Sequence, residues 1–260
     1  MQTLLDKIIS KIFGNPQSKG GIPLLPEEEV LLQTVTDYSV IIRQYIPYFH
    51  LLTEPEKKRF IHRVWHFRKS KKFHFVDITE SDQIQVLVSA AAVQLTFGLK
   101  KYRLSFFKDI YIMPDAYNYA SGQPLYIGHV SPKGIYLSWK HFLQGFEDAT
   151  DNVNVAIHEM AHALAYNNFL EEYEVDSEFR DDFAKLPAAF GPAIANRIVR
   201  QRSYLRPYAY TNIQEFWAVS VEAFFENPSA LKDTMPGLYS VISEILNQDQ
   251  LARHRIITTI

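Results

Sequence analysis

Residues 158–162 read His158-Glu159-Met160-Ala161-His162, and this stretch decides the fold. Positions i and i+4 of an α-helix lie one above the other on one face, so both imidazoles can reach a single tetrahedral metal ion. Glu159, directly after the first histidine, can then hold a water molecule at that ion. We therefore expect one zinc ion bound by His158 and His162, with Glu159 as the catalytic base.

The sequence around this motif predicts a buried helix. Apolar residues recur at helical spacing from Val153 to Leu164. Between Val153 and Ala165 the only ionisable side chains are those of the motif. Unpaired charge is costly inside a protein, and metal binding would satisfy all three groups at once. We expect an N-cap at Asp151-Asn152 and a helix end at Asn167-Asn168, since asparagine tolerates the left-handed conformation.

The composition bounds the class of protein. A net charge of −2 gives no support for a nucleic-acid-binding surface, and the absence of cysteine restricts metal ligands to His, Asp and Glu. No apolar run approaches the roughly 18 residues of a transmembrane helix, and no signal peptide is visible. We expect a cytoplasmic protein with no nucleic-acid partner and no transmembrane segment.

Turn and cap signals predict an α+β fold that is mainly helical with a small mixed sheet. The helices that we expect run from Pro26 to about Tyr45, from Thr53 to Lys72 and from Thr79 to Gly98. The strands that we expect are Asp109–Met113, Leu125–His129 and Gly134–Trp139. Zincins, the metallopeptidases built on such a helix, align an extended substrate along an edge strand, and we assign that role to one of these strands.

We expect two parts along the chain. The boundaries are residues 1–25 for an N-terminal helix and linker, and residues 26–260 for a metallopeptidase domain whose part 26–100 is helical and whose part 101–260 is catalytic. Within the first part, Leu4 to Phe13 form one apolar helical face. We expect this face to pack on the body of the chain rather than on a membrane or a partner.

The third metal ligand decides the subclass of metallopeptidase. A metzincin would need glycine at position 165 and histidine at 168, where this chain has Ala165 and Asn168. The inverted HxxEH pattern is absent as well, so a glutamate from a later helix is the remaining common ligand. The candidates are Glu171, Glu172, Glu174, Glu178, Glu215, Glu222 and Glu226.

Glu215 stands out among these candidates because it opens an apolar helical stretch that reaches Phe225, with Thr211 or Asn212 as its cap. A carboxylate in such a helix needs a strong partner. Glu222 lies two turns further along the same face. It remains the alternative ligand, or a residue that holds a ligand histidine in place.

Three segments give the chain a resemblance to the Mlc titration factor A (MtfA) family of zinc peptidases: Asn154–Leu164, Tyr208–Phe225 and Ile135–Phe142. The resemblance is good from about Asp109 to Pro228. It implies a fold similar to the catalytic domain of anthrax lethal factor.

The resemblance also implies roles for single residues. The glutamate that opens the second motif, Glu215 here, is the family's third zinc ligand. Tyr208 occupies the position of a tyrosine at the catalytic centre, where its phenol would donate a hydrogen bond to the developing oxyanion. Several members carry an aspartate three residues after the second histidine, where this chain has Ala165.

The function implied is zinc-dependent hydrolysis of peptides, with aminopeptidase activity as one form; the sequence does not separate aminopeptidase from endopeptidase. The alternative implied is a regulatory protein that binds and titrates a transcriptional repressor, as family members do with Mlc. We interpret His74, His129 and His141 as ordinary polar or core histidines. We interpret the segment from Phe183 to Tyr204 as a cover for the site.

Overall fold

The computed structural model describes residue 8 and residues 26–118, 125–148, 150–170, 175–195 and 204–253. The expected N-terminal helix lies outside these residues except for Ile8, which is buried. The elements are α2 (Pro26–Tyr45), η1 (Pro47–Leu51), α3 (Glu54–Lys69), β1 (Lys72–Phe75), α4 (Asp82–Thr96), β2 (Asp109–Met113), β3 (Gly128–Ser131), β4 (Gly134–Ser138), α5 (Trp139–Glu147), α6 (Val155–Leu170), α7 (Ser177–Phe183), α8 (Leu186–Ala195), η2 (Pro207–Tyr210), α10 (Ile213–Glu226), α11 (Pro228–Thr234) and α12 (Pro236–Leu246). The fold is α+β and mainly helical, as the sequence predicts.

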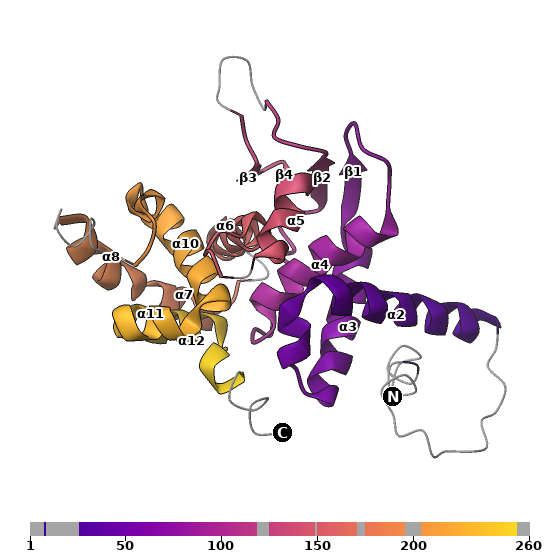
Figure 1. The fold of residues 1–260 in the computed structure, drawn as a ribbon, viewed down its shortest axis with the longest axis horizontal. Coiled ribbons are helices and arrows are strands. Elements are labelled where there is room, and N and C mark those ends of the chain that lie inside the picture. The colour runs from indigo at the N-terminus through magenta and orange to yellow at the C-terminus, as the bar shows by residue number, and fades with distance from the viewer. Residues whose placement is uncertain are drawn as a thin grey trace.

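Helix α6 lies at the centre of the molecule, with α2–α4 on one side and α7–α12 on the other (Figure 1). It contacts α4, α10 and the sheet strands β3 and β4. Helix α4 is buried from Ile84 to Thr96, and its three alanines at 90–92 have no exposed surface. Small side chains let neighbouring helices approach closely, and both α3 and α6 pack against α4.

The N-terminal helices follow their local signals. Pro26 opens α2, and the Glu56 carboxylate accepts a hydrogen bond from the Thr53 backbone N–H at 2.9 Å where α3 begins. Helix α4 begins at Asp82 rather than at Thr79. The expectation that α3 runs to Lys72 is wrong, because Lys72 is the first residue of strand β1. This strand was not predicted, because it forms only by pairing with β2, which lies far along the chain.

The sheet has the strand order β1-β2-β4-β3 and is mixed. Strands β1, β2 and β4 are parallel, and β3 pairs antiparallel with β4 at the edge. Side chains alternate between the two faces of a strand. The face turned to the hydrophobic core carries Ile110, Ile112, Ile135 and Leu137, which are fully buried. The opposite face carries a row of stacked rings at paired register positions: His74, Tyr111, Tyr136 and His129.

Strand β3 and helix α6 differ from the sequence expectation at their ends. The strand begins at Gly128, not at Leu125, because Tyr126 instead pairs with Tyr117 in an isolated bridge. Helix α6 is capped by Asn154, whose Oδ1 accepts a hydrogen bond from the Ile157 N–H at 3.0 Å. The expected cap Asp151-Asn152 forms a turn before the helix, with Asn152 in the left-handed region at φ 59°.

The expected stop at Asn167-Asn168 is wrong, because α6 continues to Leu170. Both asparagines are buried, and their side chains tie α6 to neighbouring loops instead of ending it. Asn167 Oδ1 accepts from the Phe106 N–H, and Asn168 Oδ1 accepts from the Asp176 N–H, both at 3.0 Å. None of the described residues belongs to a helix long and apolar enough to cross a bilayer.

Candidate metal centre

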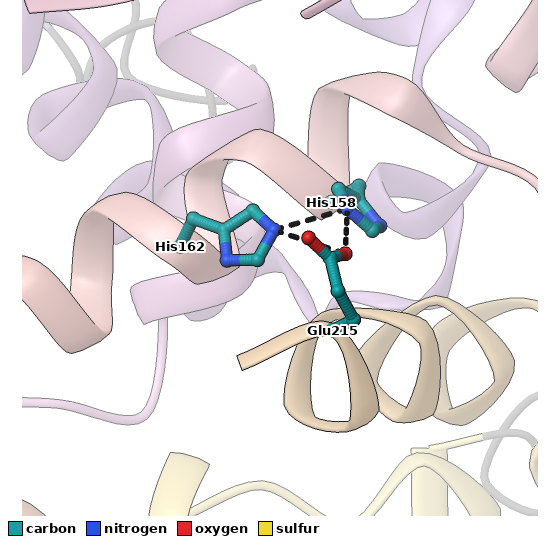
Figure 2. A group of neighbouring side chains, drawn as sticks. All are labelled: His158, His162 and Glu215. Carbon is teal, nitrogen blue, oxygen red and sulfur yellow. Dashed lines mark hydrogen bonds and ion pairs between the residues drawn. The ribbon is translucent and has the colours of Figure 1, made fainter. Parts of the chain in front are cut away.

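Three side chains converge between α6 and α10: His158, His162 and Glu215 (Figure 2). Glu215 Oε2 lies 3.1 Å from His158 Nε2 and 3.4 Å from His162 Nε2, and the two Nε2 atoms are 3.1 Å apart. Two imidazoles and one carboxylate are the ligand set of catalytic zinc sites of the His₂Glu class. These donors would repel one another without a cation or proton between them, so the residues fit a metal ion.

Helix α10 brings Glu215 to this point. The Asn212 side chain accepts a hydrogen bond from the Glu215 N–H at 2.9 Å and caps the helix, as one of the two expected caps. The indole N–H of Trp217, which is fully buried, donates to the carbonyl of Ala161 on α6 at 2.9 Å. This contact fixes α10 against the middle of the motif helix, so Glu215 faces both histidines.

Hydrogen bonding and burial set the charge states of the cluster. Burial by itself lowers the pKa of His158, but its hydrogen bonds with Glu215 and Glu222 raise that pKa to about 10. Burial by itself raises the pKa of Glu215, but the two histidines outweigh it and hold that pKa well below its usual range. Glu215 is therefore a carboxylate at neutral pH, the form that can ligate a metal.

Glu159 is 5% exposed, and its Oε2 atom is buried without a hydrogen-bond partner among the described residues. Burial raises the pKa of this carboxyl group. Gly128, at the start of β3, lies directly against it: a Cβ atom built on Gly128 would be 2.7 Å from Glu159 Oε1. The carboxyl group therefore lies in the space that the missing side chain of Gly128 leaves open.

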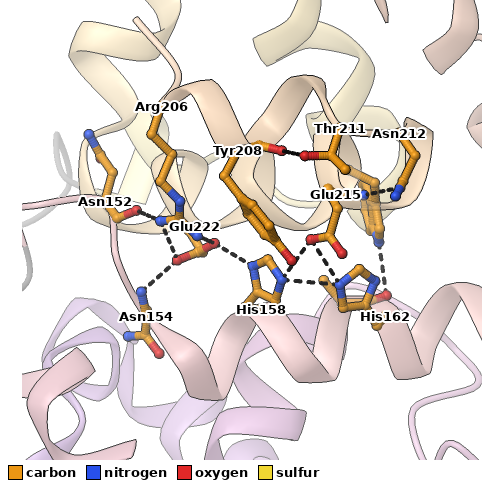
Figure 3. Close-up of polar contacts among 12 residues, drawn as sticks. Asn152, Asn154, His158, His162, Arg206, Tyr208, Thr211, Asn212, Glu215 and Glu222 are labelled. Atoms are coloured by element: carbon orange, nitrogen blue, oxygen red, sulfur yellow. Dashed lines mark hydrogen bonds and ion pairs between the residues drawn. The ribbon is translucent and has the colours of Figure 1, made fainter. Parts of the chain in front are cut away.

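A second carboxylate of α10, that of Glu222, contacts His158 on the side of the ring away from Glu215 (Figure 3). Glu222 is 1% exposed, and its Oε1 accepts a hydrogen bond from His158 Nδ1 at 2.6 Å. Its Oε2 accepts from the Asn154 backbone N–H at 2.6 Å. Arg206 donates to both oxygens, at 2.7 and 3.1 Å. Of the two roles left open by the sequence, the contacts of Glu222 match the second, because its carboxylate is the hydrogen-bond partner of His158.

Arg206 also positions Tyr208. Its Nη1 atom donates to the carbonyl of Asn152 at 2.6 Å, so the residue joins η2 to both α10 and the turn before α6. The Tyr208 ring lies 6.1 Å from the His158 ring, and its hydroxyl points toward the three converging side chains (Figure 3). Burial and the charge of Glu215 raise the pKa of Tyr208 to about 12. The phenol therefore keeps its proton at neutral pH and can donate a hydrogen bond.

The cleft extends to both sides of these residues. A cavity of about 460 Å³ and another of about 420 Å³ share part of their lining. The shared residues are Tyr126, Gly128, His158, Glu159 and Tyr208. The cavities therefore meet where the proposed catalytic groups converge.

Three of the seven histidines outside the motif are expected to be ordinary polar or core residues. His74 bonds to Asp109 at 2.7 Å, and His141 Nδ1 lies 2.7 Å from the Ser138 hydroxyl. His129 bonds to the Tyr117 hydroxyl at 2.9 Å and lines the smaller cavity. Ala165 lines this cavity too. Its methyl group cannot accept a hydrogen bond from His162 in the way that Glu222 accepts one from His158.

Sequence reasoning missed Arg206 and Gly128. An arginine two residues before the predicted catalytic Tyr208 was the available signal for the first, because a buried Glu222 requires a cationic partner. Nothing in the sequence distinguishes Gly128 from the other glycines of its loop-rich region. The expected cover, Phe183–Tyr204, falls partly outside the described residues.

Comparisons with known proteins place the chain in a family. It is similar to an uncharacterized protein of Synechocystis sp., with 22% identity over an alignment of 267 positions that covers 92% of this chain and 93% of the relative. The model of the glucose-regulated metallo-peptidase M90 family matches residues 31–246, which include all of the converging residues. This match confirms the resemblance to MtfA-like metallopeptidases and implies a metal ion. The chain belongs to the glucose-regulated metallo-peptidase M90 family.

Proposed function

We propose that the protein is a zinc-dependent peptidase in which His158, His162 and Glu215 hold one zinc ion. The observation that carries this proposal is the convergence of their three donor atoms between α6 and α10. When bound, zinc supplies a Lewis acid that polarises the scissile carbonyl group and acidifies water. The absence of cysteine leaves imidazole and carboxylate donors, which suit this ion.

Glu159 acts as the general base in this proposal. Its buried Oε2 atom has no hydrogen-bond partner among the described residues, so it is available to take a proton from the attacking water. The same carboxyl group then delivers the proton to the leaving amine. Tyr208 donates a hydrogen bond to the oxyanion that develops on the substrate. Glu222 holds His158 with its Nε2 atom toward the place where zinc would bind.

The shape of the cleft favours cleavage inside a peptide over removal of its first residue. A free carboxylate is one group by which an aminopeptidase can bind the substrate amine. Among the described residues of the smaller cavity, the only carboxylates are Glu159 and Glu215, and both have roles at the metal. Because the cavities extend to both sides of Glu159, a peptide substrate has room for residues both before and after the scissile bond.

Substituting Glu159 tests the proposal. Zinc-loaded Glu159→Gln protein should hold one equivalent of zinc but cleave a peptide library about 10²–10⁴-fold more slowly than the wild type. Glu54→Gln, at an exposed surface pair with Lys57, is the matched control and should keep full activity. Undiminished cleavage by Glu159→Gln, or wild-type protein that takes up no zinc, would contradict the proposal.

A second candidate function rests on the family resemblance alone: binding of a transcriptional repressor. The Glu159→Gln variant separates the two, because repressor binding should survive the substitution while hydrolysis should not. From the same resemblance we infer a zincin fold similar to the catalytic domain of anthrax lethal factor. The composition and the turn signals are the basis for proposing a single domain over residues 26–260 in a cytoplasmic protein.

A further inference from the structure

The larger cavity beside the metal centre has an apolar wall. Beyond the residues that it shares with the smaller cavity, its apolar lining consists of Leu125, Ile127, Val153 and Val155. We call this side of the cleft the apolar lobe. Leu125, Ile127 and Val153 are 62%, 39% and 42% exposed. A ligand that covers such side chains removes apolar surface from water, and this lowers the free energy of the complex.

Exposed apolar side chains are concentrated at this lobe. The described residues leave eight large apolar side chains exposed, and four of these, counting Tyr208, line the lobe. Single exposed apolar residues are ordinary on protein surfaces, but a cluster inside a concavity indicates a binding site. The lobe also continues directly to Glu159 and His158, so whatever occupies it lies next to the reacting bond.

The charged groups of the lobe are already paired. Arg206 donates to both oxygens of Glu222, and Glu222 accepts further hydrogen bonds from Asn154 and His158. Apart from Glu159, no described residue in the lobe has a charge left to pair with a ligand. A charged substrate side chain placed there would lose its water without gaining a partner, and this penalty selects against it.

Strand β3 indicates which side of the substrate faces the lobe. Among the described strands its one neighbour is β4, and the Ile127 carbonyl just before it accepts from the Ser138 N–H at 2.9 Å, so its outer edge is available to a substrate. Antiparallel pairing is the slightly more stable arrangement for an added strand. A substrate paired in this way crosses Glu159 beside Gly128 and then runs past Ile127 and Leu125.

We propose, on the basis of the peptidase function above, that the apolar lobe binds the side chain of the residue that follows the scissile bond. It selects bulky aliphatic or aromatic side chains there and rejects charged ones. Leu125 and Val153 are the specificity-determining residues, because they border the lobe from two segments and are the most exposed of its aliphatic side chains.

The test measures binding of three peptide hydroxamates to zinc-loaded protein by calorimetry. The compounds differ only in the side chain on the leaving-group side, which is isobutyl, methyl or carboxymethyl. We expect the isobutyl compound to bind about 10-fold more tightly than the methyl one, and the carboxymethyl compound to bind most weakly. Cleavage of peptides with Leu, Ala or Asp after the scissile bond should follow the same order.

Two variants assign this preference to the lobe. Leu125→Asp and Val153→Ser should each reduce the isobutyl preference to less than about 3-fold, with zinc content unchanged. Val40→Asp is the matched control, since Val40 is 61% exposed on α2, and it should keep the full preference.

The outcomes distinguish this inference from the proposed function. If all three hydroxamates bind zinc-loaded protein with similar affinity, or if Leu125→Asp and Val153→Ser keep the preference, the lobe assignment is wrong while the metal centre stands. A preference that appears only before the scissile bond would also overturn it. Protein that binds no zinc would refute the peptidase function and the lobe with it.

Discussion

His158 Nδ1 lies 2.6 Å from Glu222 Oε1, although the two residues are 64 positions apart in the chain. A carboxylate oxygen can only accept, so the imidazole donates from Nδ1 and turns Nε2 toward Glu215 and His162. The same carboxylate pairs with Arg206, two residues before Tyr208. Glu222 therefore links the orientation of a proposed metal ligand, His158, to the segment that carries the proposed oxyanion donor.

Replacing Glu222 should weaken metal binding. In Glu222→Gln, Arg206 loses its buried counter-charge and His158 loses a charged acceptor, so zinc affinity should fall about 10–100-fold. Competition with a chromophoric chelator measures this affinity. Glu244→Gln, which removes an exposed pair with Lys185, should bind zinc like the wild type. Unchanged zinc affinity in Glu222→Gln would show that His158 needs no charged acceptor at Nδ1.

Removing the Tyr208 hydroxyl should slow the chemical step. Tyr208→Phe keeps the ring but removes the hydrogen bond to the oxyanion, so kcat should fall about 10²–10³-fold with little change in KM. Steady-state kinetics on one peptide separate the two constants. Tyr111→Phe, on the outer face of the sheet, is the control and should change neither. A rise in KM with constant kcat would instead assign Tyr208 to ground-state binding.

A methyl group at position 128 should displace the general base. The Cβ of Gly128→Ala would lie 2.6 Å from Glu159 Cγ, closer than atoms can pack, so the carboxyl group or β3 must shift. Because small displacements of a catalytic group cost about 10²-fold in rate, kcat should fall by that order while zinc remains bound. Gly237→Ala meets no atom within 4 Å and should leave kcat unchanged. Full activity of Gly128→Ala would exclude this close contact as a requirement for catalysis.

Glu226 should make stability depend on pH. Burial, together with the charge of Glu222, raises its pKa from 4.5 to about 8. Between pH 4.5 and 8 the folded state then binds more protons than the unfolded state, so the free energy of unfolding falls as pH rises through this range. Its contribution to stability is complete below pH 4.5 and is lost above pH 8.

Glu226→Gln removes this titration. At pH 8.5 the variant should melt at least about 2–4 °C above the wild type, the shift that about 1 kcal/mol produces in a chain of this size, whereas near pH 5 the two should differ little. Scanning calorimetry across this pH range measures the difference. Glu54→Gln, at the surface, should follow the wild type throughout. Parallel curves for Glu226→Gln and wild type would show that Glu226 has an ordinary pKa.

Local signals sufficed for much of the fold. Helix α2 and the start of α3 are where proline and a capping glutamate predict them, because these contacts join residues at most a few positions apart. Strand β1 escaped prediction because it pairs with β2, which lies far along the chain. The true start of β3 escaped prediction because Tyr126, inside the expected strand, pairs with Tyr117 instead. The extension of α6 past Asn167 also depends on a contact distant in sequence: the Asn167 side chain accepts a hydrogen bond from the Phe106 N–H instead of ending the helix.

The sequence by itself determined that His158 and His162 lie on one face of a buried helix, with Glu159 next to the first histidine, because residues four positions apart in a helix lie one above the other. It also marked Glu215 as a carboxylate that needs a partner. Only the tertiary structure decided that Glu215 meets the two histidines while Glu222 stands behind one of them, and that Gly128 and Arg206 complete the site. Those relationships come from the packing of α10, β3 and η2 around α6, and contacts between distant segments leave no periodic pattern in the chain.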